Sequence, residues 1–147
     1  MAVRIPIRIT RGERVVEVSA LLNSGYEADT PQLLIPIWLA RKLELWPPPV
    51  DSREEVFDTA GGPLKVWVVG GVAVVRALGG DAESKDVVVD IVVSPLADEP
   101  LISDRLAGAL EIAVEDFAEG LWRFRWEPLG KLRRSSPTFQ ARGSLIG

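Results

Sequence analysis

Acidic side chains and one carboxamide are the groups in this chain with the clearest capacity for chemistry. Its 147 residues include no cysteine and no histidine, so thiol nucleophiles, cysteine zinc sites and Ser-His-Asp arrangements are excluded. Carboxylates, lysines, a tyrosine and backbone groups remain, and catalysis by carboxylates is the main possibility among them. Two polar corners stand out: Asn23-Ser24-Gly25, which holds the only asparagine of the chain, and Asp58-Thr59-Ala60-Gly61, which holds a carboxylate.

Composition predicts one globular, mildly acidic domain. The chain is 47% hydrophobic and 26% charged with a net charge of −4, which gives it no general attraction to nucleic acid or to anionic membranes. The most apolar stretch, residues 66–75, is too short to span a bilayer, and the start of the chain lacks a signal-peptide pattern. We therefore expect a cytoplasmic protein. The scarcity of asparagine and methionine beside abundant charged residues is typical of a thermophile.

Hydrophobic periodicity predicts a domain built mainly from strands. Apolar residues alternate over residues 3–9, and a turn at Gly12 leads to a second strand over residues 15–22 that runs directly into the Asn23 corner. Later apolar and β-branched runs predict strands over residues 33–35, 54–58, 64–69, 72–78, 86–93, 101–102, 111–114 and 121–126.

Two short helices and a glycine-tipped hairpin complete the predicted domain. A helix is expected from Pro36 to the proline run after Trp46, and another from its cap Ser103 to Leu110. Thr59-Ala60-Gly61-Gly62 is the expected hairpin tip. The domain spans residues 1–126, and residues 127–147 are expected to form a basic, loosely ordered tail because the hydrophobic period fades there.

The order of these elements resembles the retropepsin-like aspartic proteases, the single-domain family of the retroviral proteases and their cellular and archaeal relatives. The resemblance covers about residues 3–126. It is carried by "ALLNSG" at 20–25, "LIP" at 34–36, "WLARKL" at 38–43 and "EPLISDRLAGALEI" at 99–112. Two residues depart from the family pattern: Asn23 stands where the family has its catalytic aspartate, and Ser103 stands where it has a glycine.

The resemblance implies an all-β closed barrel with one or two short helices, without cofactor or metal, that forms a homodimer with its active site on the twofold axis. Asn23, Ser24 and Gly25 then occupy the catalytic-loop positions. Two facing carboxyl groups would share one proton and serve as acid and base, whereas an asparagine amide neither takes nor gives a proton near neutrality. We therefore expect a catalytically degenerate homodimer that serves as a peptide-binding or protein-interaction module.

The same resemblance suggests residues that contact a bound peptide. The hairpin tip at Thr59, Ala60 and Gly61 matches the family's flap, whose backbone would hydrogen-bond an extended ligand. Asp29 lies where the family often has an acid that contacts the peptide or stabilises the dimer. An ordinary hairpin tip and a solvated loop charge are the alternative interpretations of these residues.

An active aspartic endopeptidase is the alternative function. Asn23 precedes a small serine, and its deamidation in hot cells would generate the missing aspartate. A second route would make Asp58 the catalytic residue. Asp58-Thr59-Ala60, however, lacks the family's glycine at the third position, and a strand pattern follows it rather than an "LIP" strand and a helix.

Two further patterns are interpreted as structural. "LWRFRW" places Trp122, Phe124 and Trp126 on one strand face, which favours a core-facing aromatic side over a nucleic-acid stacking platform, since the chain is acidic. Glu27 and Asp29 lie close together but lack the spacing of a calcium loop, so no metal site is expected.

Overall fold

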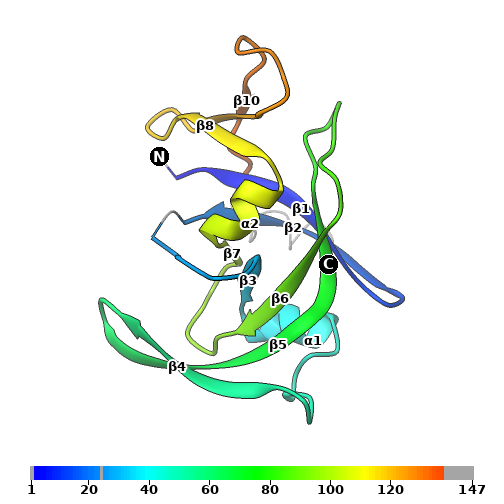
Figure 1. The fold of residues 1–147 in the computed structure, drawn as a ribbon, viewed down its shortest axis with the longest axis vertical. Coiled ribbons are helices and arrows are strands. Elements are labelled where there is room, and N and C mark those ends of the chain that lie inside the picture. Colours follow the sequence, from blue (N-terminus) through cyan, green and yellow to red (C-terminus); the bar gives the residue numbers. More distant parts are fainter. Residues whose placement is uncertain (1, 24, 138–147) are drawn as a thin grey trace.

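The computed structural model describes residues 2–23 and 25–137, and within them the fold is mostly β-structure with two short helices (Figure 1). In chain order its elements are β1 (Arg4–Arg11), β2 (Arg14–Leu22), β3 (Gln32–Ile35), α1 (Ile37–Lys42), β4 (Arg53–Thr59), β5 (Gly62–Ala77), β6 (Val87–Val93), β7 (Leu101–Ile102), α2 (Asp104–Ala109), β8 (Ile112–Asp116), β9 (Leu121–Phe124) and β10 (Arg133–Arg134). The all-β prediction is confirmed at this level.

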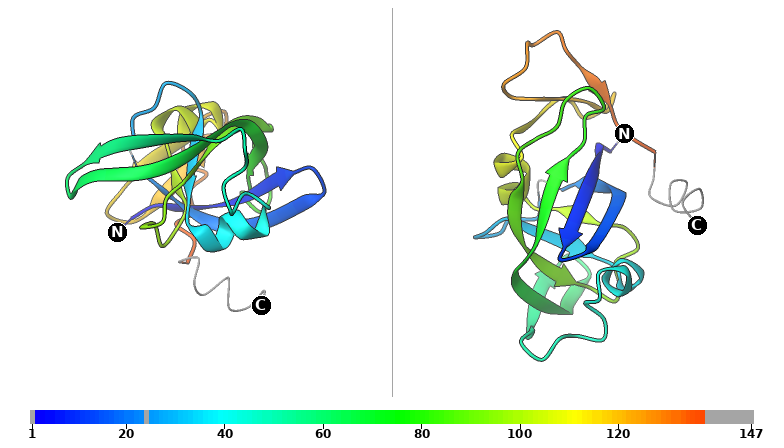
Figure 2. Two further views of the ribbon diagram at one scale, coloured as in Figure 1. Left: turned by 90° about the horizontal axis from the view of Figure 1, so that it is seen from below. Right: turned by 90° about the vertical axis from the view of Figure 1, so that its right-hand side faces the viewer.

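Six of the strands close into a barrel. Their order is β1-β2-β7-β3-β6-β5, and β5 pairs with β1 to complete the circle. β4 extends this sheet beyond β5, so that the β4–β5 hairpin projects from the barrel as an arm (Figure 1; Figure 2, left). β8, β9 and β10 form a separate three-stranded sheet beside it.

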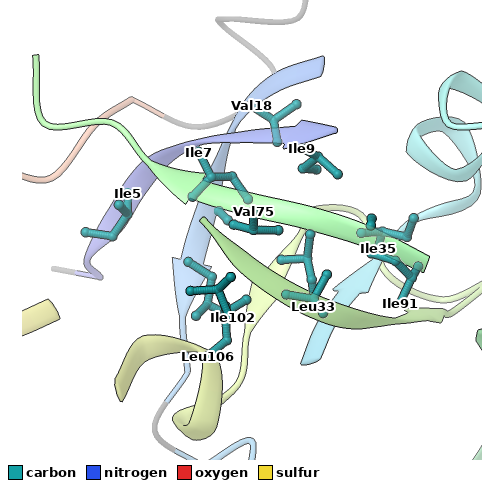
Figure 3. Close-up of a cluster of buried hydrophobic side chains, with 14 of the residues drawn as sticks. Ile5, Ile7, Ile9, Val18, Leu33, Ile35, Val75, Ile91, Ile102 and Leu106 are labelled. Carbon is teal, nitrogen blue, oxygen red and sulfur yellow. The ribbon is translucent and has the colours of Figure 1, made fainter. Parts of the chain in front are cut away.

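The barrel core follows the alternation predicted from the sequence. Ile5, Ile7 and Ile9 of β1 are fully buried, whereas Pro6 and Arg8 between them are partly exposed. Figure 3 shows the buried side chains of several elements meeting inside the barrel. Since full burial of one such side chain is worth about 1.5–3 kcal/mol, this cluster is the main source of stability for the fold.

β5 differs from the prediction of two separate strands. It runs without a break from Gly62 to Ala77, and its register with β6 shifts between Val69 and Ala73. Gly71 adopts φ +58, and its amide donates a hydrogen bond of 2.7 Å to Asp90 Oδ1. The glycine pair therefore forms an irregularity within one long strand, because glycine reaches such backbone angles without strain. This length allows one end of β5 to pair with β4 and the other end with β1.

Both predicted helices are present. In α1 the side chains of Leu39 and Ala40 are fully buried, as is Leu43 just beyond its end. Ser103 caps α2, since its Oγ accepts a hydrogen bond of 3.2 Å from the backbone N–H of Leu106. In the part of the chain that the structure describes, neither helix has the length and apolar character needed to cross a membrane.

The aromatic strand near the C-terminus is only partly as predicted. Trp122 and Phe124 are buried, in agreement with a core-facing side. β9 ends at Phe124, and Trp126 lies in the following turn, 54% exposed, with its ring stacked on that of Phe124 at 5.2 Å. Trp126 is therefore not part of a continuous buried face, because the chain turns before reaching it.

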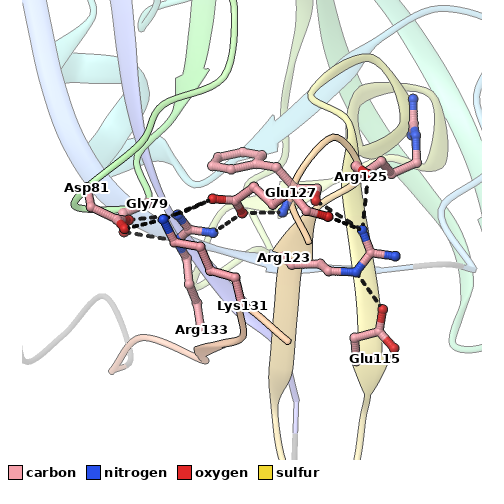
Figure 4. Close-up of polar contacts among 9 residues, drawn as sticks. Gly79, Asp81, Glu115, Arg123, Arg125, Glu127, Lys131 and Arg133 are labelled. Atoms are coloured by element: carbon pink, nitrogen blue, oxygen red, sulfur yellow. Dashed lines mark hydrogen bonds and ion pairs between the residues drawn. The ribbon is translucent and has the colours of Figure 1, made fainter. Parts of the chain in front are cut away.

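Residues 127–137 also differ from the expectation of a loose tail. Glu127 is buried, Arg133 and Arg134 form β10 against β9, and Ser136 donates its backbone N–H to the Arg4 carbonyl at 2.9 Å. The ion pair of Arg133 with Asp81, in the turn between β5 and β6, holds this segment to the barrel, and Arg133 also binds Glu127 within the segment (Figure 4). The rest of the expected tail, residues 138–147, lies outside the described residues.

Candidate functional site

A groove of about 1390 Å³ lies between the Asn23 corner and the β4–β5 hairpin. Three segments form its walls: the corner loop, which comprises Asn23 and residues 25–29, the hairpin residues 55–64, and the loop of residues 94–99. The first residues of α2 line it as well. In Figure 1 the β4–β5 arm and the loop that follows β2 extend to the same side of the barrel.

Parallel strand pairing places the Asn23 corner at this groove. β2 runs parallel to β7, with Leu21 beside Leu101 and Leu22 beside Ile102. The backbone N–H of Asn23 then donates to the Ile102 carbonyl at 3.3 Å. Because both strands end here, the corner and the start of α2 emerge side by side from the barrel.

The Asn23 side chain forms a local turn. Its Oδ1 accepts a hydrogen bond of 3.1 Å from the backbone N–H of Gly25. The backbone carbonyl oxygen of Asn23 accepts one of 2.9 Å from the backbone N–H of Tyr26. The Gly25 donor requires an oxygen at this position, which assigns the orientation of the amide. The Nδ2 group of Asn23 makes no hydrogen bond within the described residues. A side chain at Gly25 would bring its Cβ to 3.3 Å from Asn23 Oδ1, so the corner favours glycine there.

Hydrogen bonds from the start of α2 fasten the corner loop. The buried Ser103 Oγ accepts from the backbone N–H of Gln32 at 3.0 Å as well as from α2. Asp104 Oδ1 accepts from the backbone N–H of Ala28 at 3.0 Å. These bonds connect α2 to both ends of the segment between Ala28 and Gln32, so the wall of the groove is held against the barrel.

Tyr26 is the second polar side chain beside the corner, and the sequence did not single it out. Its hydroxyl donates to Gln32 Oε1 at 2.8 Å. Burial raises the pKa of the Tyr26 phenol, and the negative charge of Asp90 raises it further. The phenol therefore stays protonated at neutral pH and offers no base to a bound molecule.

The hydrogen bonding of the hairpin tip is that of an ordinary tight turn. Thr59 Oγ1 donates to the Gly62 carbonyl at 2.6 Å, and Gly62 adopts φ +109. Asp58 lies on β4 next to this tip, exposed, in register with Pro63 of β5. Its carboxylate thus belongs to the projecting arm and not to a corner of the barrel.

The groove brings together the residues that the sequence singled out. Those that line it are Asn23, Gly25, Glu27, Asp29, Asp58, Thr59, Ala60 and Gly61. Ser24 lies outside the described residues.

No protein-family model matches the chain, and no curated protein matches it. Among residues 2–23 and 25–137, no three Asp or Glu side chains are grouped so that they could hold a metal ion.

The loop of residues 94–99 also lines the groove, which the sequence did not predict. It contributes Leu96, which is 81% exposed, together with Ala97 and Asp98. Its hydrophobic pattern is too short to indicate a site, and only the fold brings it to the same groove as the β4–β5 hairpin. The groove therefore combines exposed apolar side chains, carboxylates and the backbone of two loops.

Proposed function

We propose that the protein is a catalytically degenerate relative of the retropepsin-like aspartic proteases, a homodimer that binds an extended peptide segment in the groove without cleaving it. The observation that carries this proposal is the single groove lined by Asn23, Gly25 and the tip residues Thr59, Ala60 and Gly61. An extended segment between a hairpin and a barrel corner would hydrogen-bond to backbone on both sides and place alternate side chains in the groove.

The absence of cleavage follows from the chemistry of Asn23. A carboxamide cannot remove a proton from water or supply one to a leaving amine near neutral pH. Its oxygen is in addition already engaged by the Gly25 N–H at 3.1 Å. A bound peptide would therefore meet hydrogen-bond donors at the corner but no acid or base.

A homodimer is supported by the same corner. A single chain supplies one such loop, and two copies on a twofold axis would place two Asn23 side chains face to face. Each Nδ2, which has no partner within the described residues, would then donate to the opposite copy. Two amides avoid the repulsion that two carboxylates experience at neutral pH.

An active endopeptidase is the competing function, through deamidation of Asn23 or through Asp58. The position of Asp58 on the projecting β4 strand disfavours the second route, because a paired-carboxylate mechanism needs two acids held close together. Deamidation would add about one dalton at Asn23, which peptide mapping of heated protein detects; an intact amide excludes this route.

The peptide-binding proposal predicts that Leu96→Ser weakens binding. The probes are four capped, fluorescein-labelled peptides of about ten residues, long enough for one strand, in which valine alternates with serine, glutamine, lysine or glutamate. Because a buried leucine side chain is worth about 1.5–3 kcal/mol, we expect Leu96→Ser to raise the dissociation constant of any binding peptide about tenfold or more. Fluorescence anisotropy measures binding, and mass spectrometry of the same samples should find every peptide uncut.

Leu129→Ser is the matched control for this experiment. Leu129 is also an exposed loop leucine, at 73%, but it does not line the groove. Its substitution should leave binding within about twofold. Equal effects of the two substitutions, or no binding by any of the four peptides, would refute peptide binding in the groove.

A further inference from the structure

The groove has a marked imbalance of charge. Among the described residues, seven carboxyl side chains line it but only one basic side chain, Arg105. An imbalance of this size in a concave site concentrates ligands of the opposite sign, because low-dielectric walls focus the field of the charges.

Part of this negative charge is already neutralised within the chain. Glu99 forms a two-point ion pair with Arg4, at 2.9 and 3.1 Å, and Glu55 pairs with Arg53 at 3.0 Å. Asp104 accepts hydrogen bonds from two backbone N–H groups. These three carboxylates therefore have partners before any ligand binds.

The other four carboxylates have none. Glu27, Asp29, Asp58 and Asp98 are exposed, and within the described residues none of them forms an ion pair or a side-chain hydrogen bond. They come from all three walls: the first two from the corner loop, Asp58 from the hairpin and Asp98 from the loop of residues 94–99. A segment lying along the groove would therefore meet unpaired negative charge on each side.

Apolar side chains share the groove with these carboxylates. Val56 on β4 is 64% exposed and Leu96 is 81% exposed, and both line the groove. Because side chains of an extended segment alternate between two sides, one set would cover apolar surface while the other set reaches the carboxylates.

We propose that the groove selects extended peptide segments in which lysine or arginine alternates with apolar residues. This inference rests on the proposed peptide-binding function and adds the chemical class of the ligand. The apolar residues of such a segment would cover Val56 and Leu96. Lysine and arginine fit the alternate positions because their long stems let the charged ends reach Asp29, Asp58 and Asp98. Each exposed ion pair is weak, so the preference arises from several pairs together.

The four alternating peptides described above test this inference at two ionic strengths. We expect the lysine peptide to bind about tenfold or more tightly than the glutamine peptide at about 0.01 M salt, and the glutamate peptide to bind more weakly than either. Raising the salt to about 0.15 M shortens the Debye length from roughly 30 Å to roughly 8 Å, which should reduce the lysine preference severalfold and leave the glutamine peptide unchanged.

Two triple variants with the same change in net charge distinguish an effect of the groove carboxylates from an effect of the overall surface charge. Asp29→Asn, Asp58→Asn and Asp98→Asn together should bring the affinity for the lysine peptide close to that for the glutamine peptide. The control combines Glu13→Gln, Asp51→Asn and Glu119→Gln, three exposed acids that do not line the groove, and it should change the lysine affinity by no more than about twofold at about 0.15 M salt.

The outcomes distinguish this inference from the function on which it rests. Equal affinity for the lysine and glutamine peptides, or equal losses in the two triple variants, would overturn the charge preference. If the glutamine peptide then still lost its affinity on Leu96→Ser, peptide binding in the groove would stand. Failure of all four peptides to bind would refute both.

Discussion

Under the proposed function, Asn23→Asp is expected to turn a protein that does not cleave peptides into an acid protease. The substitution keeps an oxygen for the Gly25 N–H at 3.1 Å, so the corner should retain its turn. Two aspartates across a twofold axis would share one proton and supply the missing base and acid. Since each of these catalytic roles is worth about 10²–10⁴-fold, cleavage should rise from undetectable to readily measured, and pepstatin should inhibit it.

The assay is cleavage of a heat-denatured protein, followed by mass spectrometry, between roughly pH 3 and roughly pH 7, the range over which a shared-proton carboxyl pair titrates. Asp58→Asn is the control in both backgrounds: the native chain should stay inert and the Asn23→Asp chain should still cleave, because Asp58 adds to the charge of the groove but is not part of the acid–base pair. Cleavage by the native chain that disappears on Asp58→Asn would show that the hairpin carries the catalytic residue. An inert, correctly folded and dimeric Asn23→Asp variant would contradict the assignment of the corner.

Arg133→Met is expected to cost about 3 kcal/mol of unfolding free energy, the lower end of the range for breaking a buried ion pair. Arg133 binds both carboxylate oxygens of Glu127, and it donates to the Gly79 carbonyl at 3.0 Å and to Asp81 at 2.7 Å (Figure 4). Without it the Glu127 carboxylate, whose side chain is 3% exposed, would keep only Lys131 at 3.6 Å as a cationic partner.

The guanidinium of Arg133 also packs on aromatic rings, with Cζ 5.4 Å from the Trp122 ring centroid and 5.0 Å from that of Phe124. Methionine fills part of that space, so the substitution mainly tests the loss of the positive charge. Arg134→Met, the next residue of β10, is the control; its exposed side chain has no hydrogen bond or ion pair within the described residues. Urea denaturation should give a loss of no more than about 0.5 kcal/mol for this control. Equal losses would contradict the role of the ion pair.

The loss of unfolding free energy caused by Arg133→Met should decrease as the pH falls. Hydrogen bonds from Arg133, with smaller contributions from the Phe124 N–H and the charge of Lys131, lower the pKa of Glu127 from its ordinary value of 4.5 to about 2. A carboxyl whose pKa is lower in the folded state stabilises the fold above its unfolded pKa, and this contribution is lost as the pH falls through the folded pKa. The difference between the native chain and Arg133→Met should therefore be constant above about pH 5 and shrink between about pH 4.5 and about pH 2.

Local patterns predicted most of the strands because alternating or continuous runs of apolar and β-branched residues mark them. The alternating isoleucines of β1 and the valines of β6 are visible without any partner. Gly70-Gly71 was harder to interpret, since a glycine pair can end a strand or bend it, and only pairing of β5 with both β4 and β1 distinguishes these outcomes. The order of residues 127–137 could not be predicted locally, because it depends on Arg133 meeting Asp81, more than fifty residues earlier in the chain.

The residues of the candidate site likewise divide into those that the sequence identified and those that only the structure could identify. Asn23 and the tip at Thr59, Ala60 and Gly61 could be named from the sequence because glycines and a lone asparagine mark them. Leu96 and Asp98 could not be named from the sequence. They lie in a short loop without a motif, and only the fold shows that this loop lines the groove. The four unpaired carboxylates of the groove likewise required the structure, because ion pairing is a property of the fold.

The central claim is that two copies of the Asn23 corner meet, and Asn23→Cys tests it most directly. The native chain has no cysteine, so this variant carries a single thiol, and a disulfide requires Cβ atoms about 3.5–4.5 Å apart. Under mild oxidation we predict rapid, near-complete formation of a covalent dimer at Asn23→Cys and slow formation at Asp51→Cys, an exposed loop position outside the groove. Cross-linking of Asn23→Cys that is no faster than that of Asp51→Cys would contradict the account.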